Sequence, residues 1–297
     1  MRLASRGSGK WVDYVLVIIL LAIALLCLLP IVHIFALSLS SKVASDLGRV
    51  SLWPVDPTLS AYKYVLSKPE FFASFYVSVQ RVLLGLAINM TLAVLVAYPL
   101  SKETSTFRLR SYFAWYFVIT MLVNGGLIPT YMTVKEFGLI GSIWALVIPG
   151  AVQVYNVVLL LNFFRGLPKE MEESAFIDGA GHWRVLASVY IPLSPAVLAT
   201  IALFTMVGHW NAWFDGLIYM KSPDGYPLQT YLQSLLTHLQ NELQSNLAAG
   251  NLAILDQITE RTARAAQIFL ATLPILLVYP FLQKYFIKGI VMGSVKG

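Results

Sequence analysis

Residues 168–195 read PKEMEESAFIDGAGHWRVLASVYIPLSP, a short charged stretch set between two long apolar runs. Pro168 suits the start of a helix, because the N–H that proline lacks would be unpaired in the first turn anyway. Acidic side chains follow in the first turns, where carboxylates interact favourably with the positive end of the helix dipole. Gly179 and Gly181 allow the chain to turn sharply at the end of this helix. The stretch therefore predicts a short helix over residues 170–181, lying between two membrane crossings.

The composition is that of a membrane protein. Of the 297 residues, 58% are hydrophobic and 12% are charged, whereas a soluble domain is nearer half apolar and a quarter charged. Many apolar runs approach the roughly 20 residues that cross a bilayer. We therefore expect an all-α, polytopic membrane protein in which residues 1–297 form a single transmembrane domain, with no room for a large soluble one.

Six transmembrane helices are expected. They cover residues 14–39, 72–100, 111–128, 138–164, 189–219 and 266–286. Residues 130–137 are expected to form a tight external turn, and residues 221–264 an external segment. Within that segment, apolar residues recur at helical spacing: Leu228, Tyr231, Leu232, Leu235, Leu236, Leu239 and Leu243. This pattern fits an amphipathic helix on the membrane or against other spans, and it also fits a contact for a substrate-delivering protein.

The distribution of basic residues predicts the orientation of the spans. The N-terminal tail, the loop at Lys102, the loop over residues 165–188 and the C-terminal end, counted from Lys284 near the end of the last span, together hold 12 of the 21 lysines and arginines. Because Lys and Arg are enriched in cytoplasmic loops, both termini and the 165–188 loop are expected in the cytoplasm. The first apolar run is too long for the core of a cleaved signal peptide, so it should remain as an anchor. We expect a multi-pass protein of the cell inner membrane.

The charged stretch also carries a motif with fixed spacing. Glu173-Ser174-Ala175, then Asp178-Gly179-Ala180, then Ile191-Pro192 resemble the EAA loop of ABC importer permeases. Two departures are mild changes in size: Ser174 stands where the motif has Ala, and Ile191 where it usually has Leu. The stretch Trp210-Asn211-Ala212-Trp213-Phe214-Asp215 and the tail over residues 288–297 narrow the resemblance to the oligosaccharide branch, which includes the maltose permease subunits. The resemblance covers most of the chain.

This resemblance implies a type I ABC importer permease fold and a transport subunit that is not an enzyme. In that family the loop forms a coupling helix that docks into a cleft on an ATPase subunit. The implied partners are a second homologous permease subunit, two ABC ATPase subunits that hold ATP and Mg, an extracytoplasmic solute-binding protein, a sugar substrate and the lipid bilayer. No cofactor in this chain and no nucleic-acid partner are expected.

The residues expected to couple this chain to an ATPase all lie on the charged stretch. They are Glu172, Glu173, Ala175, Phe176, Ile177, Asp178 and Gly179. A short amphipathic helix can insert apolar side chains such as Phe176 and Ile177 into a groove on a partner, while flanking acids fix its direction. The plainer alternative is an ordinary charged loop that meets only water.

A second set of candidates consists of polar and aromatic residues near span ends. Ionisable groups inside a membrane are costly and normally face a cavity or a partner, and aromatic rings beside hydrogen-bonding groups suit a sugar. The candidate substrate-path residues are Asn211, Asp215, His209, Trp213, Asn124, Gln153 and Asn156. The alternatives are interfacial anchoring for Trp, a structural cap or pair for Asp215, and helix-joining hydrogen bonds for the others. Arg81 in the second span poses the same choice.

Other functions fit the sequence less well. Gly7-Ser8-Gly9-Lys10 lacks the first glycine, the following Ser or Thr and the preceding strand of a phosphate-binding loop, and no ligand cluster suggests a metal site. A self-contained secondary carrier driven by an ion gradient would predict inverted repeats and buried mid-membrane carboxylates. A membrane enzyme would need a catalytic cluster. The sugar remains open among neutral, polyol and acidic oligosaccharides.

Overall fold

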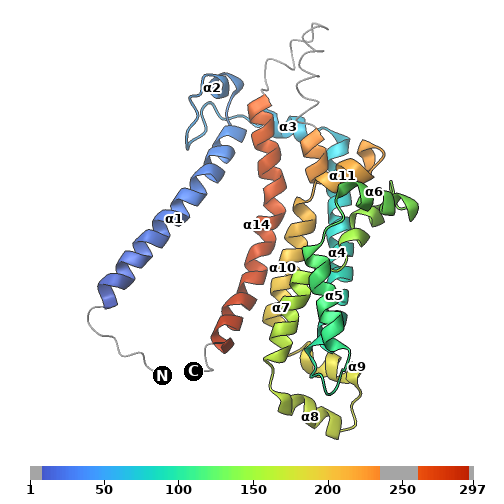
Figure 1. The fold of residues 1–297 in the computed structure, drawn as a ribbon. Helices are drawn as coiled ribbons and strands as arrows, with labels where there is room; N and C mark the ends of the chain where they lie inside the picture. Colours follow the sequence, from blue (N-terminus) through green and yellow to red (C-terminus); the bar gives the residue numbers. More distant parts are fainter. Residues whose placement is uncertain (1–8, 235–259, 294–297) are drawn as a thin grey trace. The chain divides into compact units, whose positions relative to one another are not determined.

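The computed structural model describes residues 9–234 and 260–293, and across these residues every regular element is a helix (Figure 1). The all-α fold class is therefore confirmed. The helices group into two compact units. Within the described residues, one comprises residues 9–69, 234 and 260–273, and the other comprises residues 70–233 and 274–293.

The first unit is built on a long apolar helix. Its elements are α1 (Gly9–Ser38), α2 (Lys42–Asp46), α3 (Ser60–Leu66) and the first part of α14 (Glu260–Gly293). The hydroxyls of Ser38 and Tyr62 lie 2.7 Å apart and join α1 to α3. The rings of Phe35 and Phe269 pack with centroids 4.6 Å apart and join α1 to α14.

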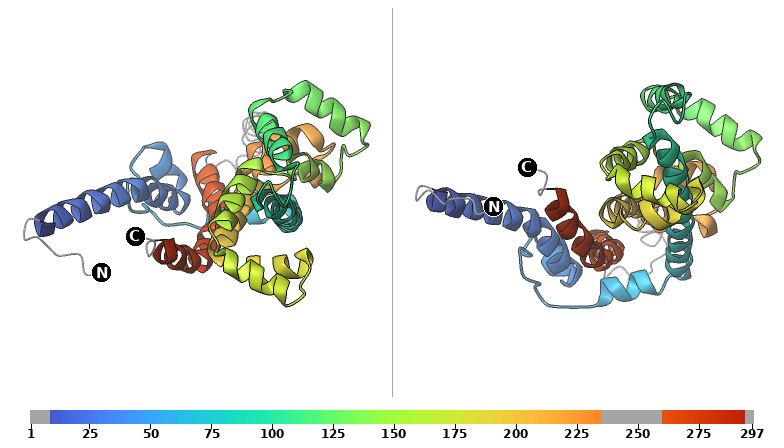
Figure 2. Two further views of the ribbon diagram at one scale, coloured as in Figure 1. Left: turned by 60° about the horizontal axis from the view of Figure 1, so that its bottom comes forward. Right: turned by 90° about the horizontal axis from the view of Figure 1, so that it is seen from below.

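The second unit is a helical bundle with short helices at both ends. Its helices are α4 (Pro69–Ser101), α5 (Arg110–Leu122), α6 (Leu127–Glu136), α7 (Val154–Arg165), α8 (Lys169–Ile177), α9 (His182–Val185), α10 (Pro195–Asn211) and α11 (Phe214–Tyr219). Figure 1 shows α8 and α9 at one end of the bundle and α6 and α11 at the other. In the left view of Figure 2, α8 projects from its end in yellow-green.

The core of this bundle lies near the α8 end. Ala97, Leu160, Phe164, Val185 and Ile201 are buried there, and they come from α4, α7, α9 and α10. Burial of such apolar side chains is the main favourable contribution to packing. The core therefore fixes the long helices at the point where α8 leaves the bundle.

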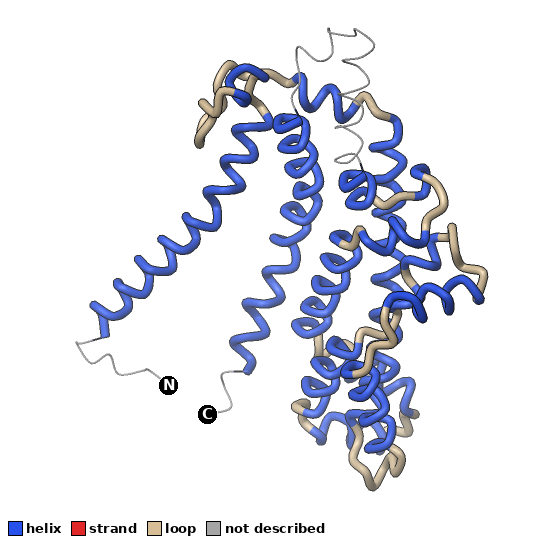
Figure 3. Tube along the Cα trace, turned by 45° about the horizontal axis from the view of Figure 1, so that its top comes forward, coloured by secondary structure: helices blue, strands red, loops and turns tan. Residues whose placement is uncertain are grey.

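The membrane crossings are of two kinds. Within the described residues, three helices are long and apolar enough to span a bilayer: Trp11–Ser38, Pro69–Ser101 and Arg261–Val278. Three further candidates are bent pairs: Arg110–Leu122 with Leu127–Glu136 at 114°, Ile143–Gly150 with Val154–Arg165 at 48°, and His182–Tyr190 with Pro195–Asn211 at 90°. If each bent pair is one crossing, there are six, as the sequence predicts. Figure 3 shows the loops that interrupt the helices.

The breaks are where the structure departs from the sequence-based boundaries. Residues 130–137, predicted as a tight turn, belong almost entirely to helix α6, which starts after Gly126 with φ of 87°. The predicted span 138–164 is α-helical only over Val154–Arg165. The predicted span 189–219 is interrupted near Pro192 and again between Asn211 and Phe214. Prolines lack an N–H and clash with the preceding turn, and glycine permits φ values that other residues avoid.

The external segment and the last span have other boundaries in the structure than the sequence predicts. Helix α14 begins at Glu260, before residue 266, so the external segment ends earlier than predicted. Of the apolar residues in that segment, Leu228, Tyr231 and Leu232 are buried. The remaining four, Leu235, Leu236, Leu239 and Leu243, lie outside the described residues.

Candidate functional site: the two ends of the bundle

Helix α8 ends in a tight turn that the sequence predicts only in part. The predicted helix over residues 170–181 stops at Ile177, because Gly179 adopts φ of 79°. The Ala180 N–H donates to the Ala175 carbonyl at 2.9 Å, and the Gly179 N–H donates to the Phe176 carbonyl at 3.0 Å. This pair of bonds is the Schellman arrangement, which satisfies the free carbonyls at a helix end. The motif glycine thus sets the length of α8.

One glutamate of α8 points into the bundle. Lys102 Nζ donates to Glu172 Oε1 at 2.5 Å and to the Tyr190 hydroxyl at 2.9 Å. The Tyr190 hydroxyl donates to Glu172 Oε2 at 2.5 Å. The Lys102 ammonium also lies over the rings of Tyr98 and Tyr190, at 4.0 and 4.2 Å from their centroids. We call these four residues the α8 anchor. Its geometry turns the Glu172 carboxylate inward, so the part of Glu172 expected to meet a partner is engaged within the chain.

The α8 anchor is shielded from solvent, which strengthens its electrostatics. The Lys102 and Glu172 side chains are only 8% and 19% exposed. Burial lowers the pKa of the Lys102 ammonium, and the adjacent Glu172 carboxylate opposes that shift. A shielded pair of this kind is costly to break by removing one partner, since the other charge is left without compensation.

A second ion pair joins the same two segments at the surface. Lys169 at the start of α8 bonds Glu103, and the side chains are 70% and 63% exposed. The bond to Lys169 lowers the pKa of Glu103, and the same bond raises the pKa of Lys169. Exposed pairs contribute little to stability because water and salt screen them.

The other residues of α8 and the turn that follows it present a largely open surface. Glu173, Asp178 and Gly179 are exposed, Phe176 is 37% exposed and Ile177 is 86% exposed. The Phe176 ring contacts the His182 ring with centroids 5.1 Å apart. Ala175 is half-buried and packs against the bundle core. Exposed apolar side chains on a short helix are a feature of docking surfaces.

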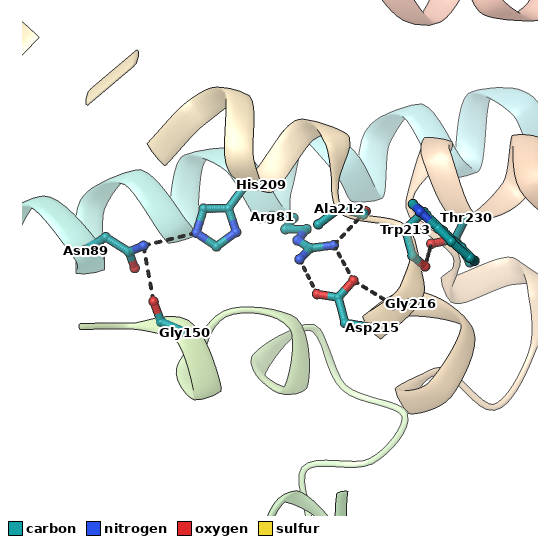
Figure 4. A network of polar contacts seen from close by, with 9 residues as sticks. All are labelled: Arg81, Asn89, Gly150, His209, Ala212, Trp213, Asp215, Gly216 and Thr230. Carbon is teal, nitrogen blue, oxygen red and sulfur yellow. Dashed lines mark hydrogen bonds and ion pairs between the residues drawn. The ribbon is translucent and has the colours of Figure 1, made fainter. Parts of the chain in front are cut away.

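At the other end of the bundle, α10 and α11 are separated by a break that is held by side chains (Figure 4). Arg81 of α4 donates through Nη1 to the Ala212 carbonyl at 3.1 Å and to Asp215 Oδ1 at 3.1 Å, and through Nη2 to Asp215 Oδ2. Thr230 Oγ1 donates to the Trp213 carbonyl at 2.7 Å. We call these residues the elbow network. It supplies a donor to the Ala212 carbonyl, which lies in the break, and a second donor to the Trp213 carbonyl, which also accepts from the Leu217 N–H of α11 at 3.2 Å. Polar main-chain groups away from water need such partners.

A separate group of polar contacts, centred on Asn89, lies beside the elbow network (Figure 4). Asn89 of α4 lies 3.3 Å from His209 Nε2 and 3.4 Å from the Gly150 carbonyl (Figure 4). With its amide turned the other way, Asn89 accepts from His209 and from Gln153 and donates to the Gly85 and Ala151 carbonyls. The His209 ring lies against Gly85, where an added Cβ would come within 2.3 Å of Nε2. Only glycine leaves room for this close approach of α4 and α10.

The predicted substrate-path residues therefore separate into two groups. Four make polar contacts within the bundle: Asp215, His209, Asn156 and Gln153. Asn156 Nδ2 donates to Gln153 Oε1 at 2.6 Å and to Thr205 Oγ1 at 3.3 Å. Three others are exposed: Asn211, Trp213 and Asn124. Asn124 Oδ1 accepts from the Gly126 N–H at 2.8 Å in the turn between α5 and α6. A role in a substrate path stays a prediction for all seven.

Several residues of these networks were not singled out from the sequence. In the sequence, Lys102 is one of several basic residues in a short loop, and Thr230, Gly85 and Tyr190 belong to no recognisable motif. The position of Lys102 directly after an apolar span is the one feature of the sequence that points to a buried contact, because lysines at span ends often reach the membrane interface or a partner.

The two networks lie at the two ends of one membrane-spanning stretch. Residues 82–101 of α4 contain no charged side chain, with Arg81 before them and Lys102 after them. At 1.5 Å per residue, twenty helical residues extend about 30 Å, the thickness of the hydrocarbon core. Arg81 and Lys102 are thus placed at opposite membrane boundaries, where charged side chains are tolerated best.

Known proteins resemble the chain over nearly all of its length, although no family model matches it. It is 37% identical over 281 residues to the polygalacturonan/rhamnogalacturonan transport system permease protein YtcP of Bacillus subtilis, covering 94% of this chain and 96% of YtcP. It is 38% identical over 295 residues to protein LplC of the same organism, covering 99% and 97%. The maltodextrin transport system permease protein MdxG, also of B. subtilis, is 26% identical over 279 residues, covering 92% and 94%.

A solved structure has the same fold. A chain in the crystal structure of a bacterial ABC transporter involved in the import of the acidic polysaccharide alginate is 32% identical. It superposes with a TM-score of 0.82 and covers 96% of this chain and 100% of the neighbour.

Proposed function

This chain belongs to the family of permease subunits of ABC sugar importers, and from that premise we propose that it forms one half of the membrane pathway of an oligosaccharide importer. The self-contained secondary carrier is not favoured, because relatives that match more than nine tenths of the chain are transport-system permeases. The observation that carries the proposal is α8, a short helix between two crossings whose Ile177 side chain is 86% exposed.

We assign α8 to the cytoplasmic side, together with both termini, because basic residues concentrate there. Phe176 and Ile177 insert into a groove of an ATPase subunit, and Glu173 and Asp178 border that contact. ATP and Mg are held by two such ATPase subunits, so hydrolysis takes place outside this chain. Closure of the ATPases moves α8, and the permease alternates between outward and inward access.

The full importer has further partners. A second, homologous permease completes the pathway within one membrane domain, and an extracytoplasmic solute-binding protein delivers the sugar. The periplasmic protein in a related alginate transporter structure is described as bound to an alginate pentasaccharide. That neighbour is 14% identical with a TM-score of 0.54, so it supports the fold, and the binding-protein partner here is our proposal.

Acidic oligosaccharides are the substrates that we propose to test first. Two relatives above 30% identity are named for the transport of acidic polysaccharides. One is named for polygalacturonan and rhamnogalacturonan, and the other belongs to an importer of alginate. Arg81 is already paired with Asp215, so the elbow offers no uncompensated cation from that side chain. Selection of the sugar charge is therefore assigned to the binding protein, while the exposed Asn211 and Trp213 contact the passing sugar.

The test is uptake by the complete importer in proteoliposomes. Ile177→Glu is compared with Phe137→Glu, which alters a 76% exposed apolar side chain at the opposite end of the bundle. Ile177→Glu should lower ATP-driven uptake of a labelled uronate oligosaccharide about tenfold or more, since a central docking side chain contributes roughly 2 kcal/mol or more. Phe137→Glu should retain most uptake. Equal losses in the two variants, or uptake driven by a proton or sodium gradient without ATP, would contradict the proposal.

A further inference from the structure

The attachment of α8 to the bundle depends on very few of its own residues. Of the nine residues of α8, only Glu172 and Ala175 are shielded from solvent, and the other seven are exposed. A nine-residue helix is too short to be stable by itself in water and needs contacts with its surroundings. Ala175 offers one methyl group, Phe176 contacts the His182 ring, and Lys169 forms only an exposed ion pair. Glu172 therefore provides the principal shielded polar contact.

That contact joins three separate segments of the chain. Lys102 directly follows α4, Glu172 lies in the first turn of α8, and Tyr190 is the last residue of the π-helical turn Leu186–Tyr190. The three polar groups are mutually bonded at 2.5, 2.9 and 2.5 Å. Tyr190 immediately precedes the 90° bend into α10. Movement of Glu172 is therefore transmitted directly to the ends of two membrane helices.

The residues around the Lys102–Glu172 pair shield it from water and so strengthen it. The Tyr98 and Tyr190 rings cover the Lys102 ammonium, and the charged pair is largely removed from water. Bonds between shielded charged groups are shorter and stronger than bonds between neutral groups. The adjacent surface pair of Lys169 with Glu103 lacks this shielding, so it constrains α8 less.

We propose that Glu172 is a positioning residue that fixes α8 to the ends of α4 and the segment before α10, so that these elements move as one body. This inference rests on the proposed coupling of α8 to an ATPase. Glu172 acts through Lys102 and Tyr190 and does not itself contact the ATPase. Its loss separates movement of α8 from movement of the membrane helices, and ATP is then hydrolysed without a matching transport step.

The first test measures ATP hydrolysed per sugar transported by the complete importer. Glu172→Gln should raise this ratio about fivefold or more, as expected for loss of a typical coupling between sites. The matched control is Glu170→Gln, because Glu170 lies in the same first turn and is exposed. Tyr190→Phe, which keeps the ring and removes the hydroxyl, should raise the ratio less. The double variant should be no worse than Glu172→Gln alone, since both changes disrupt one contact.

The second test measures the attachment itself in the full chain in lipid nanodiscs, without partners. Cys27, the single cysteine, is replaced by serine, and spin labels are placed at the exposed positions Ser105 and Ser174. Glu172→Gln should broaden the distribution of distances between the labels, whereas Glu170→Gln should leave it unchanged. If Glu172→Gln changes neither the distribution nor the ratio, the proposal is overturned.

Two other outcomes also decide the matter. Equal effects of Glu170→Gln and Glu172→Gln would indicate a general effect of charge on α8 and would overturn a positioning role. Loss of ATPase subunits from the Glu172→Gln complex, with an unchanged ratio in the remaining importers, would make Glu172 a direct ATPase contact and would also overturn it. Failure of the unaltered importer to use ATP would instead refute the proposed function, while the label distances would still test the attachment of α8.

Discussion

Arg81 and Lys102 lie at the two ends of one uncharged stretch of α4, and each binds a carboxylate carried by a short helix. Arg81 pairs with Asp215 of α11 and also bonds the Ala212 carbonyl, where the chain is not helical. Lys102 pairs with Glu172 of α8 and also bonds the Tyr190 hydroxyl. One network thus includes main-chain carbonyls at a helix break, and the other is formed by side chains alone.

This difference indicates what each network does. A broken helix at a membrane boundary needs partners for its free carbonyls, because unbonded polar groups there are costly. The elbow network supplies such a partner to the Ala212 carbonyl and should matter most for folding. The α8 anchor holds a helix whose remaining surface is mostly exposed, so its loss should affect coupling more than folding.

Arg81→Met should have the largest effect on stability. The substitution leaves Asp215 without its cation and the Ala212 carbonyl without its donor, at a cost of roughly 3–5 kcal/mol. Thermal unfolding in detergent, measured by tryptophan fluorescence, should show a much lower melting temperature for the variant. The double variant Arg81→Met/Asp215→Leu should recover part of the loss, because no charge remains unpaired. A melting temperature for Arg81→Met equal to that of Arg108→Met, at an exposed loop position, would refute the structural role of the elbow.

Gly85→Ala should destabilise the protein by overpacking the contact between α4 and α10. The new Cβ would lie 2.3 Å from His209 Nε2, and forced displacement of a packed side chain costs roughly 1–3 kcal/mol. Gly208→Ala is the matched control, since a Cβ there meets nothing within 4 Å and alanine favours a helix by about 1 kcal/mol over glycine. The two variants should therefore shift the melting temperature in opposite directions, and a shared direction would contradict the packing of His209 on Gly85.

Thr230→Val should have a smaller effect of the same kind. It removes the donor to the Trp213 carbonyl while keeping the shape of the buried side chain, which costs about 1 kcal/mol for a neutral hydrogen bond. Thr91→Val serves as the control, because exposed Thr91 donates to the Ala87 carbonyl within its own helix. A Thr230→Val melting temperature no lower than that of the control would remove Thr230 from the elbow network.

Glu103→Gln should have the smallest effect. Lys169 holds the pKa of Glu103 below its ordinary value, so any stabilisation is present above the unfolded-state pKa and is lost as the pH falls through the folded-state pKa. Both side chains are exposed, and screening makes the contribution slight. We expect no resolvable change in melting temperature or in ATP used per sugar at neutral pH. An effect as large as that of Glu172→Gln would contradict the distinction between the surface pair and the shielded anchor.

The number of crossings and the helical class were predictable because both depend on the average polarity of long runs of residues. The same averaging hides breaks. Gly126 with its positive φ, and the prolines near the bend before α10, interrupt helices without lowering the mean hydropathy of the run. The sequence consequently predicts a turn over residues 130–137, although most of them belong to α6.

The position of α8 was predictable because its motif is local in sequence. The directions of its side chains were not, because they depend on distant partners. Glu172 and Glu173 are adjacent and chemically identical, yet Glu172 binds a lysine 70 residues away while Glu173 is exposed. Likewise Asp215 pairs with Arg81 across 134 residues. Such pairings follow from how helices pack and are not visible in spacing along one segment.

The central claim is that α8 faces an ATPase with Ile177 and its own bundle with Glu172. Site-specific photo-crosslinking in the assembled importer tests it directly, with a benzophenone amino acid placed at position 177 in a chain that keeps Glu172 and in one that carries Glu172→Gln. We predict strong adducts with an ATPase subunit from position 177 in both chains, because Glu172 binds the bundle and does not contact the ATPase. Absence of these adducts when Glu172 is present, or their loss in the Glu172→Gln chain, would contradict the account.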